Sequence, residues 1–161
     1  MPQVVMCMLA PDREPDDAYA RISDFARYVD LTDTVREVVL WPPEPDGTQV
    51  SQWTVTFRNG LLRWTERDTF DPVHWTVLFD QTAGDFATFT GSWRIEPATP
   101  GSRVTFAACF DLGIPSLAEI LDPVAEAALR TNIFKIAWGL LGDVEPVDPV
   151  ELAGLVRDAG R

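Results

Sequence analysis

The stretch QVSQWTVTFRNGLLRWTERDTF, residues 49–70, decides the fold because it encodes two strands joined by a tight turn. Apolar and polar side chains alternate on both sides of Asn59-Gly60, a dipeptide typical of two-residue hairpin turns. Alternate side chains share one face of a strand, so Trp53 in the first strand and Trp64 in the second mark the apolar faces. The sequence therefore predicts an antiparallel hairpin with one apolar side.

The apolar face of the second strand also carries two carboxyl groups. Glu66 and Asp68 are in phase with Trp64 and Phe70, and a buried carboxylate is costly unless it is paired or hydrogen-bonded. One interpretation is that the strand twists or bulges and returns Asp68 to solvent, and a second is a salt bridge to an arginine. The third is that the pair handles protons or orients a ligand. The candidate arginines are Arg58, Arg67 and Arg94.

The alternation continues beyond this hairpin. Three further segments, residues 74–81, 86–96 and 103–112, alternate in the same way and are joined by short turns rich in Gly, Pro and Asp. Strands at this spacing predict one antiparallel meander, which hides one face and exposes the other.

Helical patterns flank the meander. Upstream, residues 4–9 and 35–41 have the pattern of strands, and apolar residues at helical spacing between them predict one helix or two short ones over residues 15–33. Downstream, Ser116 and Glu119 form a capping box for a short helix, which precedes a long helix over residues 123–141.

The expected architecture is one α+β domain over residues 1–142, followed by a tail over residues 143–161 with at most one short helix near residues 150–156. The long helix must cover the apolar face of the sheet, but its stripe of Ala128, Asn132 and Gly139 is small. Bulky rings opposite small residues predict a cavity, and the alternative is that the rings fill the space. The residues expected to line the cavity are Trp53, Trp64, Trp75, Trp93, Phe89, Phe106 and Ala128.

Composition excludes several classes of function. With 13 basic and 25 acidic residues the net charge is −12, which disfavours nucleic acids and anionic lipid surfaces as partners. No apolar run reaches the roughly 18 residues of a membrane span, and no secretory signal pattern opens the chain. We therefore expect a cytoplasmic protein without a membrane span, as a monomer or a homodimer.

The cysteines and the one histidine indicate no metal chemistry. Cys7 and Cys109 lie far apart in apolar strand-like runs, which favours buried free thiols, with a disulfide between them as the alternative. His74 begins a strand and is expected at the surface. One histidine and two distant cysteines do not make a common zinc site, so we expect neither a metal nor another cofactor.

Short motifs along residues 4–141 indicate a family. They are Gln52-Trp53 with Phe57-Arg58, Arg63-Trp64-Thr65-Glu66, Gly84-Asp85 leading to Gly91-Ser92-Trp93, Gly101-Ser102-Arg103-Val104 before Phe110-Asp111, and Arg130-Thr131-Asn132. With the order of elements, they resemble the START-type helix-grip (SRPBCC) superfamily, and within it the bacterial polyketide cyclases/aromatases. The resemblance implies a helix-grip fold, in which a curved antiparallel sheet wraps around a long C-terminal helix and short helices follow the first strand.

The resemblance also implies a chemistry. The aromatase/cyclases hold a poly-β-ketone, delivered on an acyl carrier protein, in an apolar pocket and promote aldol closure and dehydration. Trp64 and Trp93 match wall positions, and Asn132 matches a position on the helix. This chain departs from the family where the strand continues with Glu66 and Asp68 in place of an inward arginine. It also has Thr34 or Val35 near the place of a tyrosine.

The leading hypothesis from these observations is a polyketide cyclase. Glu66 or Asp68, with its pKa raised by the apolar wall, would shuttle a proton, and Asn132 would donate a hydrogen bond to a developing enolate. One rival hypothesis is a carrier of a quinone, lipid or isoprenoid without chemistry. Another is an interaction module whose acidic surface meets a basic partner.

Overall fold

A computed structural model describes residues 2–147 of the chain. The strands are β1 (Gln3–Ala10), β2 (Val35–Leu40), β3 (Thr48–Phe57), β4 (Gly60–Asp71), β5 (Thr76–Gly84), β6 (Thr88–Pro97), β7 (Ser102–Asp111) and β8 (Glu145–Pro146). The helices are α1 (Pro15–Ile22), the 3₁₀ helix η1 (Phe25–Asp30), the 3₁₀ turn η2 (Pro115–Leu117) and α2 (Ala118–Leu141).

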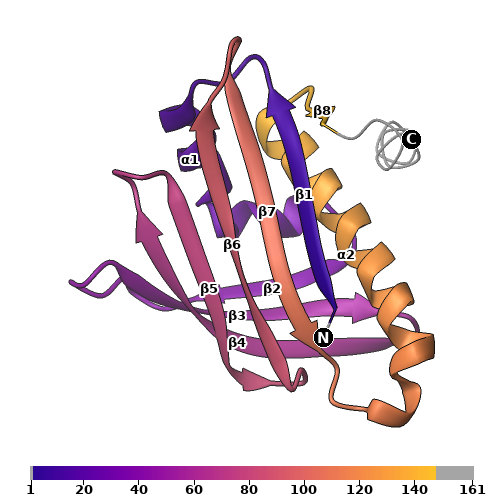
Figure 1. Ribbon diagram of the computed structural model, residues 1–161. Helices are drawn as coiled ribbons and strands as arrows, with labels where there is room; N and C mark the ends of the chain where they lie inside the picture. The colour runs from indigo at the N-terminus through magenta and orange to yellow at the C-terminus, as the bar shows by residue number, and fades with distance from the viewer. Residues whose placement is uncertain (1, 148–161) are drawn as a thin grey trace.

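The strands form one eight-stranded antiparallel sheet in the order β2-β3-β4-β5-β6-β7-β1-β8. The sheet is strongly curved, so that β2, β3 and β4 run across the direction of β1 and β7, and α2 lies along its concave side (Figure 1). The predicted α+β helix-grip architecture is therefore confirmed. The predicted tail helix near residues 150–156 lies outside the described residues.

The β3–β4 hairpin differs from the prediction by one residue at its turn. Phe57 pairs with Gly60, so the two loop residues are Arg58 and Asn59, and Arg58 adopts a φ of 58°. This register places Trp53 opposite Trp64. A loop centred on Asn59-Gly60 would instead pair a tryptophan with a carboxyl, and cross-strand aromatic pairing is the more favourable contact.

The helices also differ from their predicted bounds. The segment after β1 divides into α1 and the shorter η1, which ends at Asp30. The long helix α2 begins at Ala118 and continues through Pro123, where the sequence predicted a boundary between two helices. Proline removes one backbone hydrogen bond from a helix interior. This loss is tolerated because Glu119, whose carbonyl loses the donor, is exposed to water.

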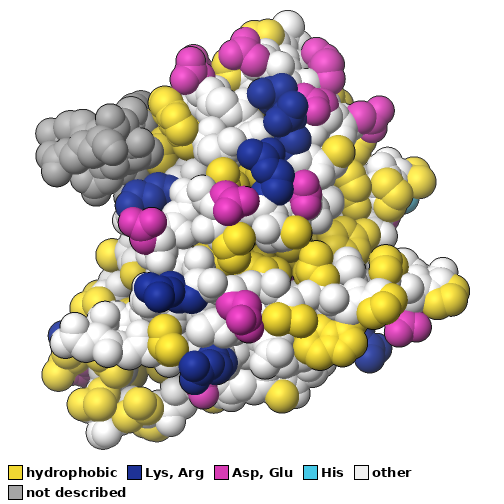
Figure 2. Space-filling model, turned by 180° about the vertical axis from the view of Figure 1, so that it is seen from behind, with side chains coloured by type: hydrophobic (Ala, Val, Ile, Leu, Met, Phe, Trp, Pro, Cys, Tyr) yellow, Lys and Arg dark blue, Asp and Glu magenta, His cyan; other side chains and the backbone are white. Residues whose placement is uncertain are grey.

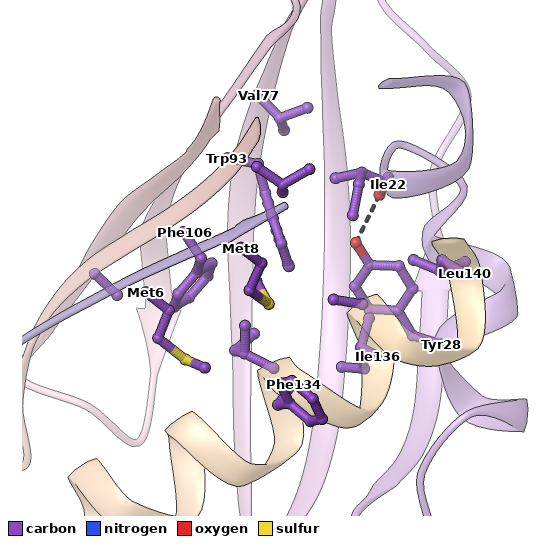
Figure 3. Packing of buried hydrophobic residues seen from close by; sticks show 14 of the residues in the cluster. Met6, Met8, Ile22, Tyr28, Val77, Trp93, Phe106, Phe134, Ile136 and Leu140 are labelled. Carbon is purple, nitrogen blue, oxygen red and sulfur yellow. Dashed lines mark hydrogen bonds between the residues drawn. The ribbon is translucent and has the colours of Figure 1, made fainter. Parts of the chain in front are cut away.

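The C-terminal half of α2 forms the solid part of the core. Ile133, Phe134, Ile136, Ala137, Leu140 and Leu141 are all buried. In Figure 3, Phe134 lies near Met8 of β1, Ile136 lies beside Tyr28 of η1, and Met6 of β1 lies beside Phe106 of β7. Burial of side chains of this size stabilises the fold by about 1.5–3 kcal/mol each, and this end of the helix anchors the sheet.

Two arginines from the α1 region secure the C-terminus of α2. Arg13 donates from Nε to the carbonyl oxygen of Leu141 at 3.1 Å, and Arg21 donates from Nη1 to that of Leu140 at 3.3 Å. Asp17 pairs with both guanidinium groups, at 3.2 and 3.0 Å. The last carbonyls of a helix lack partners within the helix and carry partial negative charge, so these cations satisfy and stabilise the helix end.

The two cysteines are free and half-buried. Both lie on the outer face, where Cys7 pairs with Thr105 and Cys109 pairs with Gln3. They are four residues apart along the β1–β7 ladder, roughly 13 Å, which exceeds the limit of about 7 Å between the Cα atoms of a disulfide. The disulfide alternative is therefore wrong, and the predicted burial of the thiols is only partial.

The surface is mixed in character. Figure 2 shows apolar side chains gathered in a band across the middle of one face, with acidic and basic side chains above and below it. Within residues 2–147, no helix is both long enough and apolar enough to cross a bilayer.

Candidate functional site

A cavity of about 150 Å³ lies between the inner face of the sheet and the middle of α2, from Ala125 to Ile136. The predicted hollow between bulky rings and small helix residues is therefore present, and Ala125 and Ala128 are the small side chains that leave the space. Six of the seven residues expected to line it do so: Trp53, Trp64, Trp93, Phe89, Phe106 and Ala128.

Trp75 is the exception, and its predicted place in the cavity wall is wrong. It precedes β5 with a φ of 49° and donates its indole N–H to Asp16 Oδ1 at 2.7 Å. The strand predicted from residue 74 begins two residues too early, because Trp75 belongs to the turn and β5 begins only at Thr76. Its side chain ties that turn to α1 instead.

Gly139 does not contribute to the hollow either. A Cβ atom at this position would lie 2.6 Å from Leu31 Cδ2. The glycine therefore permits α2 to approach the segment after η1, a packing role that helical spacing alone did not distinguish from cavity lining.

Aromatic rings form a large part of the cavity wall. The rings of Trp53 and Trp64 stack across the hairpin with centroids 6.1 Å apart and an interplanar angle of 6°. Trp64 also meets Phe86 and Phe89 edge to face at 5.4 and 5.3 Å. Such contacts contribute about 0.5–1.5 kcal/mol each beyond burial and hold the wall rigid.

Three aromatic residues that line the cavity lie outside the strand faces predicted to point inward: Phe25, Tyr28 and Phe86. Phe25 and Tyr28 come from η1, and both rings pack edge to face on Trp53, at 5.4 and 5.5 Å. The helical spacing of Phe25 showed that it is buried but did not show which element it meets. Phe86 precedes β6 in a turn, where alternation gives no information on direction.

The two carboxyl groups on β4 are buried, Glu66 with 4% and Asp68 with 0% of its surface exposed. The β3–β4 ladder is regular here, and the irregularity lies in the pairing of β4 with β5. Neither carboxyl forms a salt bridge with an arginine or lysine of residues 2–147. The interpretations that returned Asp68 to solvent or paired the carboxyls with an arginine are therefore wrong.

A hydrogen-bond network fixes both carboxyls. Trp64 donates its indole N–H to Glu66 Oε1 at 2.7 Å. Ser51 donates its hydroxyl to Asp68 Oδ2 at 2.5 Å and accepts the indole N–H of Trp53 at 2.9 Å. Asp68 Oδ1 is buried and accepts from no N–H or hydroxyl of the described residues. The carboxyl of Glu66 is within hydrogen-bonding reach of the Asp68 carboxyl, so one proton can be shared between the two groups.

The electrostatics of the pair favour one shared proton. Burial, followed by the hydrogen bond and the charge repulsion of Asp68, raises the pKa of Glu66 well above that of a solvated glutamate. Burial also raises the pKa of Asp68, but the hydrogen bonds from Glu66 and Ser51 oppose that rise. We therefore assign the proton to Glu66 and the negative charge to Asp68.

Tyr28 is the other buried titratable group beside the pair. Burial, together with the negative charge of the neighbouring carboxyl pair, raises the pKa of its phenol well above 10. Its O–H donates to the carbonyl oxygen of Ile22 at 2.6 Å (Figure 3). Tyr28 is thus a neutral wall residue whose hydroxyl is engaged in the fold.

Asn132 lines the cavity from α2, as predicted, and it also fastens the helix to the segment before β2. Its Oδ1 accepts the hydroxyl of Thr32 at 2.9 Å, and its Nδ2 donates to the carbonyl oxygen of Ala128 at 2.9 Å. An amide nitrogen has two donors, so one N–H of Asn132 can still meet a ligand.

The remaining candidates lie away from the cavity. His74 is exposed and its Nδ1 is 2.8 Å from Asp71 Oδ2, which confirms its expected surface position. That contact lowers the pKa of Asp71. Residues 2–147 contain no group of three or more His, Cys, Asp or Glu side chains placed to hold a metal ion.

Comparisons with known proteins agree with this geometry. The family model described as "Polyketide cyclase / dehydrase and lipid transport" matches residues 11–136. The chain belongs to this family, which confirms the resemblance drawn from its motifs. No curated protein matches the chain.

Solved structures share the fold. The protein TTHA0849 from Thermus thermophilus superposes with a TM-score of 0.76 at 21% identity, covering 86% of this chain and 94% of that one. A START superfamily protein from Mycobacterium smegmatis gives 0.73 at 15% identity, with 86% and 96% covered. The Zhui aromatase/cyclase from Streptomyces sp. R1128 gives 0.69 at 16% identity, with 99% and 94% covered. At these identities, the similarity concerns the fold alone.

Proposed function

We propose that the protein is a small-molecule cyclase that promotes aldol closure and dehydration of a polyketide-like chain inside its cavity. The observation that carries this proposal is Glu66, a carboxyl that combines burial, a place on an otherwise largely apolar wall and a strongly raised pKa. A carboxyl kept protonated near neutral pH can act as a general acid there. Membership of the polyketide cyclase/dehydrase family supports the same conclusion.

The cavity would act first by positioning the substrate. A cavity of about 150 Å³ accommodates roughly one aromatic ring, so the walls would hold the segment that closes while the rest of the chain stays outside. Holding a flexible chain near its reactive fold removes much of the entropic barrier. A chain that extends from the cavity is compatible with delivery on an acyl carrier protein, which is the partner that we propose.

Side chains on the wall would then assist the chemistry. Glu66 would move the proton during enolisation and loss of water, and the remaining N–H of Asn132 would donate to the developing enolate oxygen. Apolar rings around them exclude water, which strengthens each of these interactions.

The test uses a linear poly-β-ketone on an acyl carrier protein, generated in situ, with and without the protein. We expect the wild type to direct one cyclised product and E66Q to lose at least about 100-fold in rate, the contribution of general acid–base catalysis. E96Q, at an exposed carboxyl on β6, is the matched control and should behave as the wild type. A product mixture identical with and without the wild-type protein would refute the proposal.

A binding protein without chemistry is the second candidate. The apolar character of the wall and the engagement of both polar atoms of Asn132 within the protein favour it. Native mass spectrometry of the purified wild type would then show a bound quinone, lipid or isoprenoid, and turnover would be absent. An empty cavity together with directed cyclisation would exclude this candidate.

A further inference from the structure

The two buried carboxyls occupy different positions relative to the cavity. Glu66 lines it, whereas Asp68 is fully buried and is not part of the wall. We propose that they form a one-proton relay in which Glu66 exchanges protons with the ligand and Asp68, held by Ser51, receives and returns the relayed proton. This inference rests on the proposed function and assigns Asp68 and Ser51 as positioning residues behind Glu66.

The hairpin register builds the relay. Ser51 is directly opposite Glu66, and Asp68 lies one inward position further along β4. Because Ser51 Oγ accepts the indole N–H of Trp53, its own proton is free to point to Asp68 Oδ2. That leaves Asp68 Oδ1 as the oxygen without an N–H or hydroxyl partner among the described residues, and Glu66 is a hydrogen-bonding neighbour of the Asp68 carboxyl.

The described surroundings of the pair supply no compensating positive charge. The register partners of Glu66 on β3 and β5 are Ser51 and Gln81, which carry no charge. Tyr28 of η1 faces the pair in its neutral form, and α2 contributes Asn132 to the same cavity. The pair forms no salt bridge with a cation of residues 2–147, so its negative charge is stabilised by hydrogen bonds alone. A buried carboxylate without a cation partner accepts a proton readily.

The first half of the relay removes a proton from the ligand. A carboxyl oxygen has two lone pairs, so Glu66 Oε1 can keep the indole N–H of Trp64 and also take a proton from the carbon next to a ligand carbonyl. As that C–H bond breaks, the proton already on Glu66 passes to Asp68 Oδ1. The ligand becomes an enolate, Glu66 still holds one proton, and the negative charge has moved from Asp68 to the ligand.

The second half returns the proton. When the enolate expels a β-hydroxyl group, Glu66 gives its proton to the leaving oxygen and the proton on Asp68 returns to Glu66. The ligand has then lost one hydrogen and one hydroxyl as water, and the pair is restored without any oxidant or reductant. The same buried proton therefore serves both enolisation and dehydration.

The relay can be tested without any substrate. Carbon-13 NMR of labelled Glu and Asp side chains should show Glu66 protonated and Asp68 ionised near neutral pH. In D68N the amide keeps the contact with Ser51 but lacks the charge, so the pKa of Glu66 should fall by roughly one pH unit or more, a tenfold change in its ionisation constant. S51A should raise the pKa of Asp68, and S92A, on the outer face of β6, should change neither.

An unchanged pKa of Glu66 in D68N, or two carboxyls that are both ionised near neutral pH in the wild type, would overturn the relay whatever the activity of the protein.

The kinetic readout distinguishes a relay from a merely structural role. Wild-type kcat should fall at high pH as the shared proton is lost, whereas residual kcat in D68N should rise with pH because Glu66 then acts alone as a carboxylate base. Parallel pH profiles would also overturn it. Absent cyclisation with the expected titration would instead contradict only the proposed function.

Discussion

Trp53 and Trp64 stack across the β3–β4 hairpin, with ring centroids 6.1 Å apart, and each donates its indole N–H to an inward side chain two positions away on its own strand. Trp53 donates to Ser51, and Trp64 donates to Glu66. The same two rings therefore form part of the cavity wall and orient the carboxyl pair. The cavity and its acidic group thus depend on one hairpin.

The raised pKa of Glu66 predicts a specific pH dependence of stability. The folded protein keeps a proton that the unfolded chain releases above the ordinary pKa of glutamate, so the free energy of unfolding falls as pH rises through this window. In E66Q the amide can accept from Trp64 and donate to Asp68 but does not titrate. Relative to the wild type, E66Q should gain up to about 1.4 kcal/mol per pH unit between the unfolded and folded pKa values of Glu66.

Urea unfolding at a series of pH values measures this difference. E96Q, at an exposed carboxyl, should follow the wild type throughout. Parallel stability curves for E66Q and the wild type above the ordinary pKa of glutamate would contradict the assignment of the proton to Glu66.

Filling the cavity should abolish ligand binding without unfolding the protein. A128F places a ring in the space that Ala128 leaves open, whereas A127F places the same ring on the exposed side of α2. With naphthol as a neutral aromatic probe, fluorescence titration should show loss of binding in A128F only. Because the ring enters an existing hollow, the stability of A128F should stay within about 1–3 kcal/mol of the wild type. Equal binding by both variants would place the ligand elsewhere.

The arginine contacts at the C-terminus of α2 should contribute to stability but not to binding. R21A removes the donor to the carbonyl oxygen of Leu140, so the free energy of unfolding should fall by about 0.5–1.5 kcal/mol. R36A, at an exposed position on β2, is the matched control and should cost less. Thermal unfolding with a parallel naphthol titration separates the two effects, and a loss of binding in folded R21A would argue against a purely structural contact.

The bond between Thr32 and Asn132 should hold α2 to the segment before β2. T32V deletes the hydroxyl and leaves Asn132 Oδ1 without its donor, which should cost about 1–3 kcal/mol. T32S restores the hydroxyl and should recover most of that loss. Urea unfolding of the three proteins tests this order, and equal stability of T32V and T32S would show that the bond contributes little.

The faces of the strands could be predicted because side-chain direction follows a period of two wherever a strand is regular. This rule places Trp64, Glu66 and Asp68 on one side from their numbers alone, and burial confirms all three. The rule does not apply in turns, which is why the direction of Trp75 was predicted wrongly.

The cross-strand partners could not be predicted, because they depend on the register. A loop at Asn59-Gly60 would have paired Ser51 with Asp68 and Trp53 with Glu66, whereas the observed loop pairs Ser51 with Glu66. The contacts of Ser51 with the carboxyl pair were therefore not predicted. The contacts of η1 with the cavity wall could not be predicted either. They depend on tertiary packing, and a sequence pattern does not show which distant elements meet.

The hairpin closed by the two-residue loop at Arg58 and Asn59 carries both the indoles and the carboxyls, and this restricts how the protein can evolve. Trp64, Glu66 and Asp68 occupy alternate positions of β4, so losing one residue from β4 before Trp64 would turn its indole and both carboxyls outward together. Proteins built on this hairpin can therefore vary their chemistry by substitutions at positions such as Ser51, Glu66 and Asp68. A change in strand length would instead disrupt the site.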